Sequence, residues 1–478
     1  MSFDAVIVGA GPNGLAAAIE LARAGLSVHV IEACEEIGGG AKSLELTLPG
    51  FVHDPFSAIH PLTAGSPFFS RLPLAEHGLR WVHPPAPLAH PFDQGGAAVL
   101  EREIDETARH LGGDGAEYAA LVRPIVDEWQ ELAEDILSPI GFPRSPLALA
   151  RFGLLAIRSA QSVAEKKLNG GRAAALFAGS AAHSGLALDR PGSAAFGLVL
   201  SAAGHAVGWP FPAGGAKRIT AAMASYLTSL GGTISTGVPV GDLRELPPAR
   251  AVLLDLTPAQ ILKIAGDRLP SRYRSKLGRF RYGAGVFKLD WALDEPIPWR
   301  DPACRRAATV HLGGGLTEIV RAMNFAAAGE LSDTPFVLLA QHTLFDLSRA
   351  PAGKHTAWAY CHVPNGSTAD MAARVEAQVE RFAPGFRDVV LARSELSPAR
   401  LNQLNANLVG GDVNGGAPDL GQLLLRPVPR LDPYAIPGGD LYICSASTPP
   451  GGGVHGMCGF HAARSALKRS FGMRSPPP

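Results

Sequence analysis

The chain has 478 residues, of which 46% are hydrophobic and 18% are charged. This composition excludes an intrinsically disordered chain, which would be more charged and poorer in aliphatic residues. Lys plus Arg and Asp plus Glu both total 43, so the basic excess typical of a nucleic-acid-binding protein is absent. Five widely spaced cysteines indicate reduced thiols, and the first residues lack the basic segment of a secretion signal. We therefore expect a cytoplasmic protein.

The first 40 residues contain an ordered set of short elements. Residues 5–8 are a β-branched run typical of a buried parallel strand. The glycine-rich segment 9–14 follows, then an Ala- and Leu-rich helix over 15–24 and a second strand over 27–32 that ends in an acid. Strand, glycines, helix, strand and acid in this order predict a Rossmann-type dinucleotide site.

Each residue type in this motif has a physical reason. Gly9 permits a tight turn, Gly11 lets the backbone approach a diphosphate, and Gly14 lets the helix pack on the strand. Pro12 and Asn13 begin the helix, whose N-terminus favours negative charge. Glu32 can accept hydrogen bonds from ribose hydroxyls and would repel a phosphate there, which argues against a phosphorylated nicotinamide cofactor.

The stretch from roughly 69 to 203 has a mainly helical pattern. An amphipathic helix is predicted over 146–163, with Arg151 and Arg158 on an otherwise apolar segment. Such a helix can lie on a bilayer surface, or it can be a domain face whose arginines extend to water. The charge-free stretch 191–216 is interrupted by Gly and Pro, which predicts a buried helix with an exit loop rather than a membrane span.

Strands return in the second half of the chain. We predict strands over 233–240, 251–256 and 337–342, and a helix over 369–382. The glycine cluster at 309–315 is not followed by a strand ending in an acid, so a separate nicotinamide domain is not expected.

The C-terminal region has the same order of strand, glycine-rich loop and helix as the N-terminal region. A strand over 438–447 leads into the glycine-rich loop 448–459, and a helix over 460–470 follows. A helix that begins there would place its positive end near a ligand that carries negative charge.

These motifs together resemble a known family. Segments 36–43 and 49–54 after the acid, and 448–459 near the end, are similar to the flavin-dependent amine oxidase and phytoene desaturase superfamily. The strings at 58–61, 205–210 and 409–416 resemble its phytoene dehydrogenase-like branch, which includes carotenoid desaturases, retinol saturase and pyridine nucleotide-disulfide oxidoreductase-domain proteins. The resemblance extends over essentially the whole chain.

The resemblance implies an α/β fold with a Rossmann-type FAD-binding domain in three discontinuous segments and an inserted α+β substrate domain. The implied FAD-binding segments are 1–68, 205–279 and 429–472; the substrate segments are 69–204, mainly helical, and 280–428, sheet plus helices; and 473–478 is a disordered tail. The residues implied to bind FAD are Gly9, Gly11, Pro12, Asn13, Gly14, Glu32, Ala33, Gly39, Gly40, Ala41, Lys42, Val240, Ser445, Gly453, Val454, His455, Gly456 and Met457. Lys42 stands where an arginine is common, and Val238 is the alternative to Val240.

The implied activity is hydride transfer between the flavin and a CH–CH or C=C bond of a hydrophobic polyene, isoprenoid or lipid-like substrate. His60 and His455 are the acid–base candidates, and oxygen, a quinone or another organic molecule would accept electrons. No metal-site motif is present. A flavin amine oxidase and a non-catalytic FAD-binding protein remain as alternatives, peripheral membrane contact is a hypothesis, and the oligomeric state is not predicted.

Overall fold

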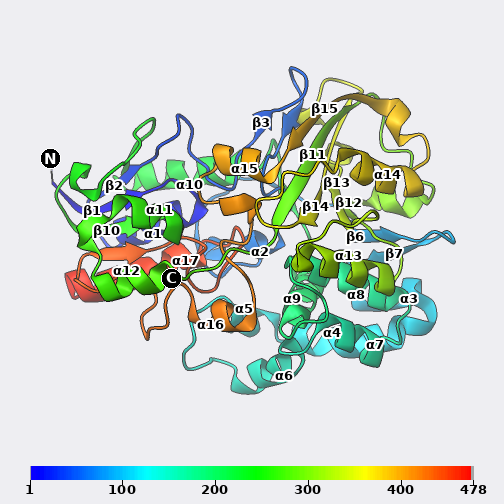
Figure 1. The fold of residues 1–478 in the computed structure, drawn as a ribbon, viewed down its shortest axis with the longest axis horizontal. Coiled ribbons are helices and arrows are strands. Elements are labelled where there is room, and N and C mark those ends of the chain that lie inside the picture. The colour runs from blue at the N-terminus through cyan, green and yellow to red at the C-terminus, as the bar shows by residue number, and fades with distance from the viewer. Residues whose placement is uncertain (1, 475–478) are drawn as a thin grey trace.

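The computed structural model describes residues 2–474, so residues 475–478 of the predicted tail lie outside the described part. Two sheets organise the chain. A five-stranded sheet with its helices occupies one end of the molecule, and a seven-stranded sheet with its helices occupies the other (Figure 1). The predicted α/β class with a Rossmann-type sheet is confirmed.

The five-stranded sheet is entirely parallel, and its strands come from three separate stretches of chain. Its order is β16 (Leu441–Ile443), β10 (Ala249–Leu254), β1 (Phe3–Val8), β2 (Val28–Ile31) and β9 (Thr233–Ser235). The central strands are apolar and buried, as expected for a parallel sheet covered on both faces.

Helices cover both faces of this sheet. On one face are α1 (Pro12–Arg23), α10 (Lys217–Ser229) and α17 (Met457–Ala466), packed on side chains such as Ile7 and Val30. On the other are α11 (Pro258–Ile264) and α12 (Ser271–Leu277), packed on Val8 and Leu254. Because side chains alternate between the two faces along each strand, each strand contributes to the apolar core on both faces of the sheet.

The seven-stranded sheet is antiparallel except where β12 pairs with β6. Its order is β15 (Val390–Leu396), β11 (Gly285–Leu293), β14 (His355–Val363), β13 (Val337–Ala340), β12 (Ala307–Leu312), β6 (Ala86–Pro91) and β7 (Ala97–Leu100). Two small ribbons pair β3 (Leu44–Glu45) with β4 (Val52–His53), and β5 (Trp81–Val82) with β8 (Phe211–Pro212).

One face of the larger sheet packs on α14 (Ala372–Phe382), and the other faces a helical layer. That layer contains α3 (Ile104–Leu111), α4 (Gly115–Val126), α5 (Trp129–Ile136), α6 (Pro146–Ala156), α7 (Ala160–Lys167), α8 (Arg172–Ala182), α9 (Ser193–Ala206) and α13 (Leu316–Ala328). The short helices α2 (Pro61–Ala64), α15 (Pro398–Leu404) and α16 (Leu420–Leu425) lie nearer the middle of the molecule (Figure 1).

The structure corrects several element predictions. The helix predicted over 146–163 is two helices, because Ser159 caps a new one by accepting a hydrogen bond from the Ser162 amide. The mainly helical stretch also contains β5, β6 and β7; β6 reads Ala-Pro-Leu-Ala-His-Pro, which has weak strand propensity, and its pairing with β12 and β7 makes it a strand. The strand predicted over 233–240 ends at Ser235.

The stretch 191–216 contains the buried helix α9, as expected. Within residues 2–474, none of the helices combines the length and the apolar character that a bilayer crossing requires.

Candidate active site

A large cavity of about 910 Å³ is lined by residues that follow strands of the parallel sheet, by strands of the seven-stranded sheet and by the helical layer. Two helices begin at its wall: Pro12 and Asn13 start α1, and Met457 starts α17. The N-terminal ends of helices carry partial positive charge and free amide groups. The cavity therefore brings the two ends of the chain to one place suited to an anionic ligand.

The glycines at the α1 end have distinct steric roles. A Cβ on Gly14 would lie 2.1 Å from the Gly9 carbonyl oxygen, and a Cβ on Gly39 would lie 2.7 Å from the Gly11 Cα. Gly39 also has a φ of +52°. A Cβ on Gly40, by contrast, would meet no protein atom within 4 Å, and Gly40 lines the cavity. Gly14 and Gly39 therefore hold backbone against backbone, and Gly40 leaves open space for a ligand.

Asp255, at the end of β10, was missed by the sequence analysis. Its Oδ2 accepts a hydrogen bond from the Gly14 amide at 2.9 Å, and the residue lines the cavity beside Gly11. Burial, together with the nearby Glu32, raises the pKa of Asp255 to about 7, against the effect of the Gly14 hydrogen bond. Nearby, the buried Oδ1 of Asn13 has no hydrogen-bond partner within the described chain.

Glu32 directly follows β2, and its carboxylate accepts hydrogen bonds from the backbone amides of Ala10 (2.7 Å) and Cys34 (3.0 Å). Of the predicted FAD-binding residues, those that line the cavity are Gly11, Pro12, Asn13, Gly39, Gly40, Ser445, Gly453, Val454, His455 and Met457. Those outside the lining are Gly9, Gly14, Glu32, Ala33, Ala41, Lys42, Val240 and Gly456. Next to Glu32, the Val238 amide donates to the Glu32 carbonyl, while Val240 is half-buried against the core beneath β10.

The C-terminal motif loop is tied to the segment around α2. The Thr63 hydroxyl donates to the Val454 carbonyl, and the Ser66 hydroxyl donates to the His455 carbonyl at 2.6 Å. The His455 ring uses Nδ1 to accept the Met457 amide (3.1 Å) and Nε2 to contact the Gly451 carbonyl (3.2 Å). Both ring nitrogens of His455 are therefore engaged by the backbone, so its role in this structure is to hold the loop.

His60, the other predicted acid–base residue, caps α2 and lines the cavity. Its Nδ1 lies 3.4 Å from Ser57 Oγ and 3.5 Å from Thr63 Oγ1, and its buried Nε2 has no hydrogen-bond partner within residues 2–474. Burial lowers the pKa of His60 to about 4, so the ring is neutral at pH 7. A neutral imidazole with an unpaired nitrogen can accept or donate one hydrogen bond.

The sheet wall of the cavity carries further groups that the sequence analysis did not find. Lys288 on β11 lines the cavity, forms an ion pair with Asp290, and places its Nζ 5.3 Å from the centre of the Trp358 ring. Burial lowers the pKa of Lys288 and raises that of Asp290 to about 6, and each residue opposes the shift of the other. Trp358 and Tyr360 on β14 stack with ring centres 5.6 Å apart. The charged pair Lys288 and Asp290 on an otherwise apolar strand is the signal that could have revealed this wall.

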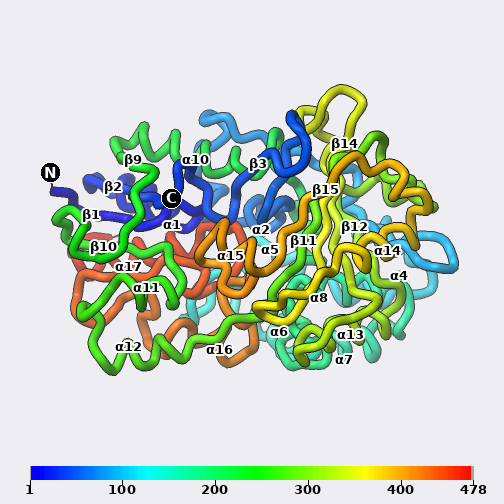
Figure 2. The backbone as a smooth tube through the Cα atoms, turned by 45° about the horizontal axis from the view of Figure 1, so that its top comes forward, coloured from blue at the N-terminus to red at the C-terminus, as the bar shows by residue number. Residues whose placement is uncertain are grey.

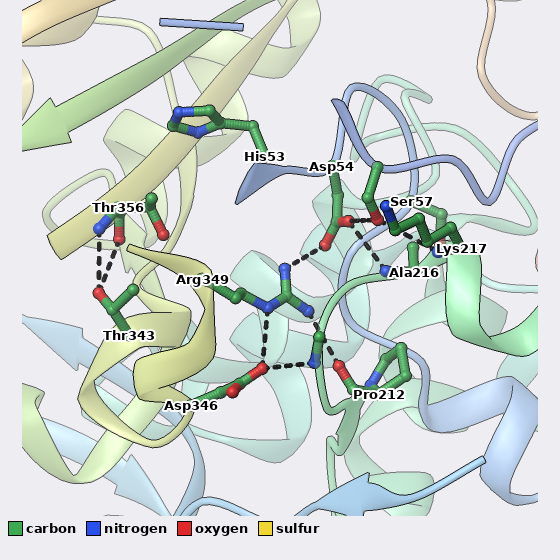
Figure 3. Close-up of polar contacts among 12 residues, drawn as sticks. His53, Asp54, Ser57, Pro212, Ala216, Lys217, Thr343, Asp346, Arg349 and Thr356 are labelled. Atoms are coloured by element: carbon green, nitrogen blue, oxygen red, sulfur yellow. Dashed lines mark hydrogen bonds and ion pairs between the residues drawn. The ribbon is translucent and has the colours of Figure 1, made fainter. Parts of the chain in front are cut away.

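A buried ion cluster connects the segments around the cavity (Figure 3). The Asp54 carboxylate accepts hydrogen bonds from Arg349 Nη1 (2.6 Å), the Ser43 hydroxyl (2.5 Å) and the Ala216 amide (2.9 Å). Arg349 also donates to Asp346 at 3.2 Å. Although burial alone would raise the pKa of Asp54, Arg349 and its other partners lower it to about 2. The cluster fixes three distant segments in one arrangement.

These features fit a bound dinucleotide. The open space at Gly40, the unpaired Asn13 Oδ1, the two helix N-termini and the adjoining apolar wall are all on one cavity. No group of three or more His, Cys, Asp or Glu side chains suited to a metal ion occurs in the described part of the chain.

Comparison with known proteins agrees with this geometry. Residues 7–72 match the model of the NAD(P)-binding Rossmann-like domain family. The rat "pyridine nucleotide-disulfide oxidoreductase domain-containing protein 2" is 26% identical, over 98% of this chain and 93% of its own length. Phytoene dehydrogenase of Streptomyces griseus is 27% identical, over 82% of this chain and 78% of its own.

Among solved structures, a double mutant of putrescine oxidase aligns with a TM-score of 0.61 at 18% identity, covering 98% of this chain and 99% of that one. The fold is thus shared with an amine oxidase. The fold and these relatives support placing the chain in an FAD-dependent oxidoreductase superfamily. They also support FAD as the cofactor.

Proposed function

We propose that the protein is an FAD-dependent oxidoreductase that acts on CH–CH or C=C bonds of a hydrophobic substrate such as a polyene, isoprenoid or lipid. The observation that carries the proposal is the continuity of one cavity from the two helix N-termini to an apolar wall that includes Leu338, Ala340, Val199 and Leu200. When bound, FAD supplies a ring that accepts or donates a hydride. The phytoene dehydrogenase relative, by its name, acts on phytoene.

The chain's own residues have separable roles in this proposal. The backbone at Gly11, Gly39 and Gly40 would hold the cofactor diphosphate, and the α17 N-terminus would stabilise negative charge on the ring. Lys288 would orient polar groups of the substrate at the sheet wall. His60 would accept or donate a proton at its unpaired Nε2.

A flavin amine oxidase is the second candidate, because putrescine oxidase shares the fold and the aromatic pair Trp358 and Tyr360 lines the cavity. The Lys288 ammonium on the same wall is neutralised by Asp290, so this pair by itself does not distinguish an amine from an uncharged substrate. A non-catalytic FAD-binding protein is the third candidate.

Anaerobic photoreduction of the purified protein, followed by rapid mixing with oxygen, a quinone or a polyene, separates these functions. Fast reoxidation of the reduced flavin by a polyene or quinone supports the proposal. Reduction of the oxidised flavin by an amine, in a parallel anaerobic mixing experiment, supports the amine oxidase, and inertness toward every partner supports a binding role.

A variant pair sharpens this test. The double variant Lys288→Met, Asp290→Asn removes the buried charge pair without leaving a lone carboxylate, and we expect it to keep FAD and to slow reoxidation by about 100-fold. The exposed Lys263→Met is the matched control and should react like the wild type. Equal rates in all three proteins would exclude a role for Lys288.

We also propose that the mouth of the cavity meets a membrane surface, as the route for an apolar substrate. Ile140, Phe142, Ile157 and Leu424 line the cavity and are exposed, with Phe142 fully exposed at 105%. Helices α6 and α16 lie on the same side of the molecule in both views (Figures 1 and 2). Exposed apolar side chains around an apolar opening favour an interfacial position.

The helix α6 has the pattern that such a position requires. Its outward face presents Leu147 and Leu154, and Ile157 continues that face just after the helix ends. Arg151 and Arg158 are also exposed there. Arginines beside apolar residues suit the headgroup layer, where their charge stays hydrated. The burial of the opposite face, including Phe152, fixes this orientation.

A further inference from the structure

One part of the cavity wall is formed by the middle strands of the seven-stranded sheet. Thr309 on β12, Leu338 and Ala340 on β13 and Tyr360 on β14 all line the cavity. The strand register pairs Thr309 with Ala340 and Leu338 with Tyr360. Since residues two apart on a strand share a face, these side chains form a continuous patch on one face of the sheet.

The polar atoms of this patch have no protein partner. Thr309 is 4% exposed, and its Oγ1 is buried without a hydrogen bond to any residue of 2–474. The Tyr360 hydroxyl, in a half-buried side chain, likewise lacks a hydrogen bond within the described chain. A buried hydroxyl left unpaired costs free energy, so its presence on a cavity wall indicates that a ligand satisfies it.

His183, at the end of α8, covers the same patch from the helical side. Its ring lines the cavity, stands edge-on to Trp209 with centres 5.4 Å apart, and places Nε2 2.9 Å from Nε2 of His311. His311 follows Thr309 by two positions on β12, so it shares the cavity-facing side of the strand. The two imidazoles must therefore share one hydrogen, with one ring donating and the other accepting.

The surroundings of His311 decide which ring donates. Its Nδ1 is buried against Gly179 and has no partner within the described residues, and an orphaned buried N–H is rarer than an orphaned acceptor. The His311 proton therefore belongs on Nε2, where it is donated to His183. A neutral His183 then carries its own proton on Nδ1. Burial lowers the pKa of His183 to about 3, which keeps the ring neutral at pH 7.

We propose that His183, Thr309 and Tyr360 form a subsite for a neutral oxygen function, a hydroxyl or a carbonyl, on an otherwise hydrophobic substrate. The inference rests on the proposed function and narrows its substrate class from plain hydrocarbons to oxygen-bearing ones. His183 donates to the oxygen, the Thr309 and Tyr360 hydroxyls donate or accept, and His311 keeps His183 in the required tautomer. All of these groups are neutral, so the subsite disfavours a carboxylate.

Binding of three related isoprenoids tests the subsite. Farnesol, its hydrocarbon counterpart farnesene and ionised farnesoic acid are titrated at pH 8 into the FAD-containing protein, with fluorescence of cavity residues Trp209 and Trp358 as the readout. We expect farnesol to bind at least about tenfold more tightly than farnesene, and farnesoate to bind more weakly than farnesol.

Variants assign the preference to this patch. Thr309→Val removes a hydroxyl that bonds to no protein atom, so it should fold normally and reduce the preference for farnesol by about three- to tenfold, with farnesene affinity unchanged. Thr356→Val is the matched control, because the Thr356 hydroxyl is also buried and unpaired but lies outside the cavity lining. His183→Phe should remove most of the remaining preference.

Three results overturn the subsite: no preference for farnesol in the wild type, an equal loss in Thr356→Val, or farnesoate binding more tightly than farnesol. The colour and photoreduction of the same samples report separately on the proposed function. Yellow, photoreducible protein without an alcohol preference refutes only the subsite, whereas protein that cannot be reconstituted with FAD refutes the proposed function.

Discussion

Replacement of Asp255 by Asn tests how the dinucleotide motif is assembled. The Asp255 carboxylate is buried between the end of β10 and the start of α1, where Oδ2 accepts the Gly14 amide at 2.9 Å. Its pKa is raised by burial, and further by Glu32, from 3.8 to about 7. Asn keeps an oxygen acceptor for Gly14 and removes the titratable charge.

The sign of the effect follows from proton linkage. Because the pKa of Asp255 is higher in the folded state, stability falls as the pH rises from 3.8 to about 7, where the unfolded chain has lost this proton and the folded protein still holds it, and the full loss remains above that interval. Above pH 7 the difference between 3.8 and about 7 corresponds to about 4 kcal/mol of destabilisation. At pH 5 only the interval from 3.8 to 5 counts, which leaves less than about 2 kcal/mol.

We therefore expect Asp255→Asn to raise the free energy of unfolding by about 4 kcal/mol at pH 8 and by less than half of that at pH 5. Urea unfolding of both proteins at the two pH values, followed by circular dichroism, measures the difference. The exposed Asp267→Asn is the control and should stay within about 0.5 kcal/mol of the wild type at both. A gain that does not change between pH 5 and pH 8, or a loss at pH 8, would refute the reasoning.

Three further predictions concern other parts of the molecule. Arg349→Met leaves the Asp54 carboxylate buried without its cation and should cost about 3–5 kcal/mol in urea unfolding. Arg349 helps to lower the pKa of Asp54 to about 2, whereas burial raises it, so Asp54 in the variant protonates more readily and the loss should be smaller at pH 5 than at pH 8; a loss that is larger at pH 5 than at pH 8 would contradict the ion pair. Gly40→Ala adds a methyl group that meets no protein atom, so it should leave stability unchanged but weaken FAD binding by at least about tenfold by absorbance titration; full FAD affinity would place the cofactor elsewhere. Phe142→Ser with Leu154→Ser should reduce flotation with phosphatidylcholine vesicles by about tenfold or more, since each exchange removes an exposed apolar side chain; an absence of wild-type flotation would refute the membrane contact.

Much of the dinucleotide half of the site could be predicted from local patterns. The order of β1, the glycines, α1, β2 and Glu32 occupies about 30 consecutive residues, and each step depends on neighbours along the chain. Gly11, Gly39 and Gly40 were expected at the cofactor, and the structure places all three on the cavity. The C-terminal loop was found in the same way, although α17 begins at Met457, three residues before the predicted start.

The rest depended on contacts between distant segments. Gly14 and Asp255 are separated by 241 positions, and nothing near Asp255 in the sequence reveals the amide from which it accepts a hydrogen bond. His183 and His311 come from a helix and a strand 128 positions apart, and each is unremarkable in its own segment. His455 was predicted to be an acid–base residue, but the backbone of its own loop engages both ring nitrogens.

The sequence by itself determined the class of fold and the position of the nucleotide motifs, because glycine conformation, helix ends and strand burial are local properties of short segments. Only the tertiary structure decided which side chains face the cavity and which polar atoms remain unpaired. Those properties arise when the seven-stranded sheet, the helical layer and the parallel sheet pack together, since burial and hydrogen bonding are settled by neighbours that the chain brings from far away.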